Sequence, residues 1–147
     1  MSKLGTFEQA EKLKYLGFRK NCLHYYNYDG KEKIEEAYFF DNEERVFVHD
    51  LYEDFNDSNY IYSAPTVSDA LDWIREEKGI ACGAYPNIEV YDEDIYPFIG
   101  YSHVYYNGTE FIKGDDFDTH PLASSALLDA VLDYLEKKEI DFITPSF

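Results

Sequence analysis

The chain has very few cysteines, the residues that stabilise many small proteins through disulfides or bound zinc. Its 147 residues include two cysteines, Cys22 and Cys82, which are too few for a disulfide framework or a four-ligand zinc site. No apolar run, at the start or later, reaches the length of a signal peptide or a membrane span. We therefore expect a reduced, cytoplasmic protein without membrane association, whose core forms without disulfides or cofactors.

Basic side chains are also scarce, since 13 Lys and Arg stand against 30 Asp and Glu and the net charge is −17. Residues 1–28 carry five basic and two acidic side chains, so the excess acid lies beyond them. Such a field repels nucleic acid and anionic lipid and attracts basic partners. Direct binding of nucleic acid is therefore disfavoured, and the simplest role of the excess acid is to maintain solubility.

Aromatic residues, in contrast, are abundant: they make up 18% of the chain and include 15 Tyr and 11 Phe. This is not the composition of a disordered chain, and Tyr and Phe favour strands. No repeat, low-complexity tract or linker divides the sequence. We therefore expect one domain over residues 1–147.

The clearest local pattern lies in residues 63–80, S-A-P-T-V-S-D-A-L-D-W-I-R-E-E-K-G-I. Thr66 can cap a helix after Pro65, and Gly79 can end it. Apolar residues recur on one face at helical spacing, namely Val67, Ala70, Leu71 and Ile74, with Trp73 beside them. Polar residues fill the opposite face, namely Ser68, Asp72, Arg75 and Glu76. The pattern predicts a helix over 66–78.

Two further helices are predicted. The first begins at Thr6, with Gln9 at the capping-box position, and ends at Gly17, after which Phe18 packs back on the helix. The last covers 122–138, after Pro121, and carries a wide apolar stripe, formed by Leu127, Leu128, Val131, Leu132 and Leu135.

Short runs rich in Tyr, Phe, Val and Ile lie between the helices and are typical of strands. The expected strands are 22–28, 37–40, 45–52, 60–62, 80–85, 88–91, 98–106 and 109–113, while 31–36 is ambiguous. Pro86 and Asn87 break the chain between two of them. Asn107-Gly108 predicts a two-residue hairpin loop, and 41–44 predicts a four-residue one.

Hairpin connections favour antiparallel pairing over parallel crossovers, so the expected fold class is α+β. We predict a mainly antiparallel sheet of about five to six strands, with two to three helices packed on one face. An antiparallel sheet needs helices on one face only. The other face would then expose tyrosines and offer a surface for interaction.

Two patterns contain possible metal ligands. Asn27, Asp29, Gly30 and Glu36 match part of a calcium-binding loop, but Tyr25 stands at its first position and Lys31 and Lys33 stand inside it, which favours a turn. The acidic loop at 114–120 offers three carboxylates for a cation, those of Asp115, Asp116 and Asp118. Such a loop is more often a solvated surface, so we assign no metal site.

Cys82 is the candidate nucleophile if His103 or His120 lies beside it. Cys22 alternates with His24 in a strand, and apolar or aromatic residues flank His49 and His103, so core or sheet-surface positions are expected for them. The common nucleotide, zinc and hydrolase motifs do not occur, and 30 acidic residues are too many to single out a catalytic pair. We therefore assign no catalytic or cofactor-binding residues.

Two helical segments carry a resemblance. A-P-T-V-S-D-A-L-D-W-I-R-E-E-K-G-I (64–80) and A-S-S-A-L-L-D-A-V-L-D-Y-L-E (123–136) resemble the helices that flank a short sheet in small uncharacterised proteins of phages and prophages of anaerobic gut bacteria. Ile74 stands where Leu is commoner in that group. The resemblance covers about residues 60–138. It implies a small accessory protein, and it attaches no activity and no functional residues.

Three functions follow as hypotheses. The favoured one is a non-enzymatic module that docks a protein partner through its Tyr-rich sheet face or its acidic surface. The second is an acidic mimic of nucleic acid that inhibits a DNA-acting enzyme, with rows of carboxylates from 43–57 and 92–118. The third is a small enzyme that uses Cys82 or a pair of carboxylates. The identity of the partner and the oligomeric state are left open by the sequence.

Overall fold

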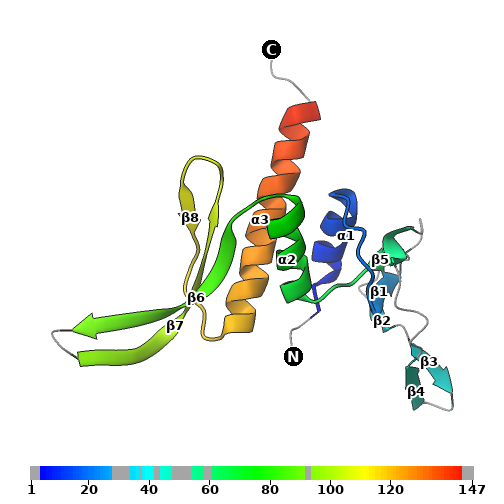
Figure 1. The fold of residues 1–147 in the computed structure, drawn as a ribbon. Helices are drawn as coiled ribbons and strands as arrows, with labels where there is room; N and C mark the ends of the chain where they lie inside the picture. The colour runs from blue at the N-terminus through cyan, green and yellow to red at the C-terminus, as the bar shows by residue number, and fades with distance from the viewer. Residues whose placement is uncertain are drawn as a thin grey trace. The chain divides into compact units, whose positions relative to one another are not determined.

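The computed structural model describes residues 4–27, 34–36, 38–41, 44–47, 54–57, 61–91 and 94–143. Its contacts divide the chain into two compact units, one over Leu4–Thr66 and one that begins at Val67. Helices and antiparallel strands occur in both (Figure 1), so the α+β class is confirmed. That residues 1–147 form one domain stays a prediction.

The expected single sheet of five to six strands is wrong. The described strands form three separate ladders, of three, two and three strands. Most pairings join strands that follow one another along the chain. The exception is the first strand, residues 24–27, which also pairs with the later strand 61–63. The pattern of apolar residues identifies strands, but it does not specify which hairpins combine into one sheet.

The first helix, α1 (Phe7–Tyr15), begins and ends as predicted. Thr6 Oγ1 accepts the Gln9 N–H at 3.1 Å while Gln9 Oε1 accepts the Thr6 N–H at 2.8 Å, so the capping box is complete. After the helix, Gly17 has a φ of 96° and the Phe18 N–H donates to Leu13 O at 2.9 Å. Residues close in sequence therefore fix both ends.

The strands of this unit form two ladders. β1 (His24–Asn27) lies between β2 (Ile34–Glu36) and β5 (Ile61–Ser63) in an antiparallel sheet. β3 (Tyr38–Asp41) and β4 (Glu44–Phe47) form a second antiparallel pair, in which Asp41 stands directly opposite Glu44. The hairpin expected here is confirmed, but it turns more tightly than a four-residue loop. A short 3₁₀ helix, η2, covers Phe55–Asp57.

An aromatic cluster and a buried amide hold this unit together. The Phe7 ring lies edge-on to Tyr26 and to Tyr62, with ring centroids 5.5 Å apart in each pair. Buried Asn56 donates from its side chain to Phe18 O at 2.9 Å and accepts the Ser63 N–H at 2.8 Å. The amide thereby connects the end of α1 to β5 through η2.

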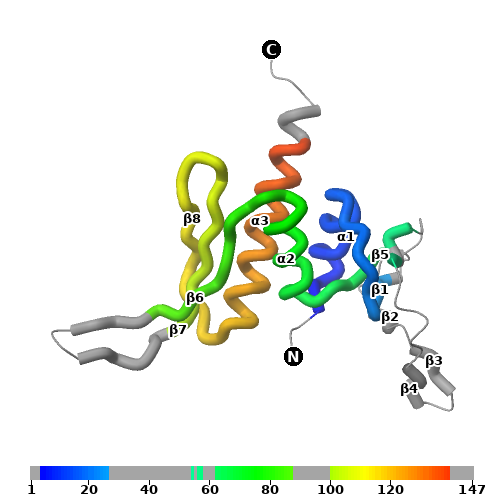
Figure 2. The backbone as a smooth tube through the Cα atoms, viewed as in Figure 1, coloured from blue at the N-terminus to red at the C-terminus, as the bar shows by residue number. Residues whose placement is uncertain are grey.

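The second unit contains α2 (Val67–Glu77), β6 (Cys82–Tyr91), β7 (Asp94–Tyr106), β8 (Phe111–Lys113) and α3 (His120–Ile143). The sheet order is β6-β7-β8, and α3 contacts β6, β7 and α2 (Figure 1, Figure 2). The apolar stripe predicted for the last helix is confirmed, because its side chains at Leu127, Leu128, Val131 and Leu132 are fully buried.

Alternation along β7 decides which side chains α3 covers. The rings of Tyr105 and Tyr101 lie 5.6 and 5.5 Å from those of Tyr134 and His120, which belong to α3. Because successive side chains of a strand point to opposite faces, Tyr106 lies on the face away from α3. Phe111 of β8 pairs directly with Tyr106 and shares that face.

The predicted break at Pro86 and Asn87 does not end the strand, because β6 extends from Cys82 to Tyr91, although its register with β7 shifts between Asn87 and Glu89. The Tyr106 N–H donates to Ala81 O at 2.9 Å, so Ala81 and every second residue after it point their backbone groups toward β7. Pro86 has the opposite parity and its nitrogen points out of the free edge. A proline at such a position removes no ladder hydrogen bond.

The loop between β7 and β8 is longer than Asn107-Gly108 predicts. Asn107 Oδ1 accepts the N–H groups of Thr109 and Glu110, each at 2.9 Å. Gly108 has a φ of 95°. Because the Asn107 side chain bonds to backbone ahead of it, the turn closes over four residues, 107–110, and the hairpin itself is confirmed.

Truncation of the buried stripe of α3 tests this packing. We expect Leu128→Ala to lower the free energy of unfolding by about 2–5 kcal/mol, because it leaves a cavity in a fully buried site. Leu122→Ala, in the same helix but 47% exposed, is the matched control and should cost less than about 1 kcal/mol. Urea denaturation measures both, and equal losses would contradict the packing described.

Candidate functional site

The described residues hold no converging set of metal ligands. No group of three His, Cys, Asp or Glu side chains among them is placed to bind a metal ion. Asn27 ends β1 and Glu36 lies in β2 opposite His24, so the structure places these two residues on adjacent antiparallel strands. Asp29, Gly30, Lys31 and Lys33 lie outside the described residues.

The acidic loop after β8 is bound to the sheet. The Gly114 N–H donates to His103 O at 2.8 Å, and Tyr101 and Phe117 exchange two backbone hydrogen bonds of 2.7 Å. Asp115 and Asp116 therefore both stand opposite Ser102, which is a β-bulge. The carboxylate of Asp116 accepts a hydrogen bond of 2.7 Å from the Asn87 side chain. The loop thus extends the sheet and does not gather its carboxylates around a point.

His103 is buried beneath this bulge. Its ring stacks on Phe117 with centroids 5.9 Å apart, and it is 6% exposed. The ring fills the space beside Gly114, where an added Cβ would lie 2.0 Å from it. Burial lowers the pKa of His103, and the charge of Asp115 acts in the opposite direction. A neutral, packed histidine is therefore the form that the fold favours.

Cys82 does not form a nucleophile–base pair with a histidine in the part of the chain that the structure describes. No hydrogen bond joins its thiol to His103 or His120 there, and the charged group beside it is Arg75. Burial raises the pKa of the Cys82 thiol, although Arg75 opposes that shift. Since the thiolate is the nucleophile, this position does not favour catalysis. Cys22 is buried, and His49 lies outside the described residues.

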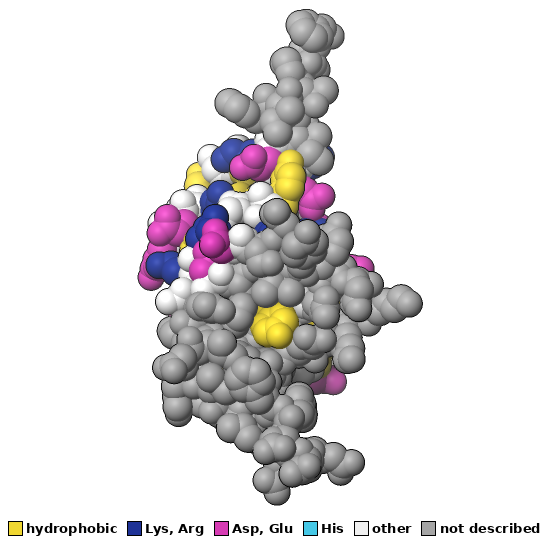
Figure 3. Space-filling model, turned by 90° about the vertical axis from the view of Figure 1, so that its right-hand side faces the viewer, with side chains coloured by type: hydrophobic (Ala, Val, Ile, Leu, Met, Phe, Trp, Pro, Cys, Tyr) yellow, Lys and Arg dark blue, Asp and Glu magenta, His cyan; other side chains and the backbone are white. Residues whose placement is uncertain are grey.

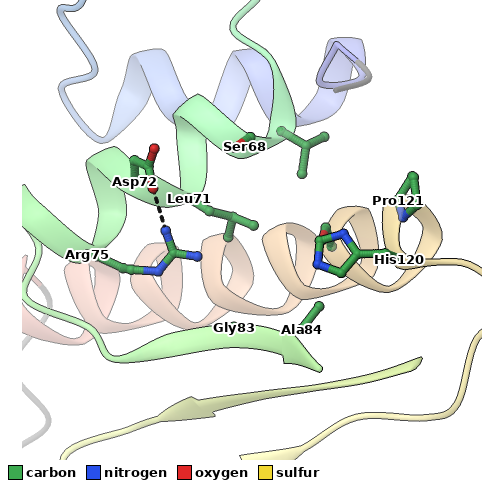
Figure 4. A pocket seen from close by; sticks show the side chains of 10 residues that line it. Ser68, Leu71, Asp72, Arg75, Gly83, Ala84, His120 and Pro121 are labelled. Atoms are coloured by element: carbon green, nitrogen blue, oxygen red, sulfur yellow. Dashed lines mark hydrogen bonds and ion pairs between the residues drawn. The ribbon is translucent and has the colours of Figure 1, made fainter. Parts of the chain in front are cut away.

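A cavity of about 410 Å³ lies between α2, the beginning of α3 and β6 (Figure 4). The side chain of Arg75 extends from α2 to β6, where its Nε donates a hydrogen bond of 2.9 Å to Cys82 O. Its Nη1 donates to Asp72 Oδ1 at 2.7 Å. His120 lies at the opposite end, with Nδ1 3.4 Å from Ser124 Oγ. The remaining wall includes apolar side chains, those of Val67, Leu71, Ala84 and Pro121, together with Ser68.

Sequence reasoning missed this cavity. It assigned Asp72 and Arg75 to the outer face of a helix, and both side chains are indeed partly exposed. The feature of the sequence that points to this site is Arg75, the one arginine of the acidic helix α2, three residues after Asp72. Helical spacing predicts that pair, but it does not reveal that the same guanidinium also reaches the edge of β6.

The face of the sheet away from α3 carries an exposed aromatic pair. Phe111 is 68% and Tyr106 is 38% exposed, and their ring centroids are 4.9 Å apart. We call these two residues the aromatic pair. The sequence predicts exposed tyrosines on the free face of a single sheet; the described strands do not form that sheet, and the exposed pair found here consists of one tyrosine and one phenylalanine.

Acidic side chains are interspersed with basic ones where they are described. Arg19 forms ion pairs with Asp54 at 2.5 Å and Asp57 at 2.8 Å, and Arg75 pairs with Asp72. In the upper part of the face shown in Figure 3, described carboxylates stand among Lys and Arg side chains. Mimicry of nucleic acid needs rows of unpaired carboxylates, and that hypothesis stays a prediction.

The part of the chain that the structure describes has no helix suited to a membrane. None of its helices combines the length and the apolar character that crossing a bilayer requires. The expected cytoplasmic location stays a prediction.

The burial of His103 predicts a specific pH dependence. The pKa of His103 is lower in the folded state than in the unfolded chain, so the unfolded chain binds the proton first as the pH falls. Stability should therefore decline below about pH 6.5 and be unaffected by this group above about pH 7.5. Urea denaturation between pH 7.5 and 5.5 measures the effect. His103→Phe should flatten the profile, whereas His120→Gln, at an exposed position, should leave it unchanged.

The contact between Gly114 and His103 supplies a second test. Gly114→Ala should lower the free energy of unfolding by about 1–3 kcal/mol, because the added methyl group overlaps the imidazole ring. Gly83→Ala is the matched control, since nothing lies within 4 Å of its Cβ position. Thermal denaturation compares the two, and a Gly114→Ala protein as stable as Gly83→Ala would contradict the packing of His103.

Comparisons of the chain with protein-family models, curated proteins and solved structures find no match. The resemblance to phage and prophage proteins stays a prediction.

Proposed function

We propose that this chain is a non-enzymatic interaction module that docks a protein partner through the aromatic pair, Tyr106 and Phe111. The observation that carries the proposal is the exposure of two large rings that contact one another on the uncovered sheet face. Aromatic side chains are enriched at the centres of protein interfaces and supply much of their binding energy.

The rings are held in place before any partner arrives. They stand opposite one another on paired strands, next to a loop that the Asn107 side chain closes. Tyr134 of α3 donates its hydroxyl to Asn107 O at 2.9 Å, which ties that loop to the helix. Binding therefore costs little ordering entropy, which favours affinity.

The surroundings of the aromatic pair are suited to an interface rim. Thr109, Glu110 and Lys113 are exposed beside it, and a polar rim around an apolar centre is the usual arrangement. With a net charge of −17, the chain attracts basic proteins at long range. We accordingly propose a partner that offers an apolar pocket within a basic surface.

The proposed origin is consistent with this role. The helical segments 64–80 and 123–136 suggest by resemblance a small accessory protein of a phage or prophage, for which binding to another protein is a suitable role. This origin is part of the proposal and adds no functional residue to it.

Affinity capture tests the role of the aromatic pair. The immobilised full chain is incubated with lysate of the cells that produce it, at low and high salt. We expect Phe111→Ser to reduce recovery of the specific partner at least tenfold, because the loss of an interface anchor costs about 2 kcal/mol or more. Capture should persist at high salt, since apolar contacts are not screened.

Tyr15→Ser is the matched control, because Tyr15 is 58% exposed and lies in the other unit. Its recovery should equal that of the unaltered chain. Equal recovery with Phe111→Ser would contradict the proposal. Salt-sensitive capture of a DNA-acting enzyme, independent of Phe111, would favour nucleic-acid mimicry instead.

A further inference from the structure

We propose that the cavity between α2, β6 and the first turn of α3 binds a small carboxylate with a short apolar substituent. This inference concerns residues other than the aromatic pair and does not rest on the proposed function. It combines a fixed cationic group, a second polar group across the cavity and an apolar wall of suitable size.

The guanidinium of Arg75 is the anchor. Its Nε and Nη1 atoms are held by Cys82 O at 2.9 Å and Asp72 Oδ1 at 2.7 Å. Figure 4 shows the remaining nitrogen, Nη2, directed into the cavity. A guanidinium already fixed in this way binds a carboxylate without losing further side-chain freedom, and charge-assisted hydrogen bonds of this type are among the strongest in proteins.

His120 supplies a polar group at the other end. Its ring lies edge-on to Tyr101 with centroids 5.5 Å apart, and its Nδ1 is 3.4 Å from Ser124 Oγ. These two contacts fix the plane of the ring, which reaches over the cavity opposite Arg75 (Figure 4). An imidazole N–H held there adds a further hydrogen-bond donor to the wall of the cavity.

The free edge of β6 adds a backbone donor. The Gly114 N–H binds His103 O on the far side of β7, and His103 pairs with Ala84. The backbone N–H of Ala84 therefore points away from β7, out of the same edge at which Arg75 meets Cys82 O. Ala84 also lines the cavity, so this N–H is available at its border.

Charge and size select the ligand. The single positive charge of Arg75 is paired with Asp72 in a chain of net charge −17, so a monoanion is tolerated better than a dianion such as phosphate. Val67, Leu71 and Pro121 give the cavity an apolar wall, and its volume of about 410 Å³ admits a small organic acid. A branched aliphatic acid fits both requirements.

The same chemistry has two sources, a free aliphatic acid or the C-terminal carboxylate of a polypeptide. Titrations of the isotope-labelled full chain followed by NMR distinguish them, with four probes: isovalerate, isovaleramide, N-acetyl-Gly-Val and its C-terminal amide. We expect saturable shifts of the Ala84 N–H and the Leu71 methyl groups with isovalerate. The neutral isovaleramide should bind at least tenfold more weakly, since it lacks the charge-assisted hydrogen bonds.

The affinities of isovalerate and N-acetyl-Gly-Val, compared with one another, show whether the natural ligand is a free acid or the C-terminus of a polypeptide. Binding of N-acetyl-Gly-Val at least tenfold tighter than isovalerate, and abolished in its amide, assigns the cavity to a chain terminus. Isovalerate binding as tightly as the dipeptide, or more tightly, assigns it to a free acid. Either result supports a carboxylate site.

Variants test the assignment of the anchor. Arg75→Gln should weaken isovalerate binding at least tenfold, and Arg19→Gln, an ion-paired arginine of the other unit, should leave it unchanged. Asp72→Asn keeps an acceptor for Nη1 and removes the competing charge, so it should tighten binding a few-fold and stays informative if Arg75→Gln fails to fold. Equal binding of acid and amide, absence of shifts at 50 mM isovalerate, or loss of binding in Asp72→Asn would overturn the proposal.

Discussion

The antiparallel ladder between β6 and β7 is the constraint on which the described chemistry depends. The bond from the Tyr106 N–H to Ala81 O sets its parity, and parity determines both the face and the edge that each residue occupies. Tyr105 and Tyr101 thereby meet α3, while Tyr106 faces away from it. A slip by one residue would exchange the faces and bury the aromatic pair. The two proposed surfaces therefore share one structural cause.

The bulge at 115–116 protects the register on the other side of β7, where β7 pairs with β8 and the segment that follows it. Because Asp115 and Asp116 oppose the single residue Ser102, the chain bends over His103, whose ring fills the space beside Gly114. A ladder shifted by one residue would place a side chain where only a glycine fits. The acidic loop, which the composition presents as a solvated surface or a cation site, thus serves to fix the pairing of the sheet.

The sequence predicted those features that depend on neighbouring residues. The capping box of Thr6 and Gln9, the stop at Gly17 and the apolar stripe of the last helix each need contacts within one or two turns, and all are confirmed. The single sheet was wrong, and the strand end predicted at Pro86 is instead a shift of register between Asn87 and Glu89, because both features depend on which strand lies beside another. The role of Arg75 was missed for the same reason, since its bond to Cys82 O forms only after α2 and β6 have packed together.

The two proposed sites respond in opposite ways to the charge of the chain. A net charge of −17 draws basic proteins toward the whole surface, but it also repels any carboxylate that approaches the cavity. Within the cavity, however, Arg75 lies in direct contact range, where a fixed donor outweighs distant acids whose field is screened beyond about 8 Å at physiological salt. Added salt therefore weakens the long-range attraction of a basic partner while it removes a barrier to the small acid. Asp72 lies well inside this screening distance, since its carboxylate is 2.7 Å from the guanidinium of Arg75, and its charge therefore opposes a bound acid directly.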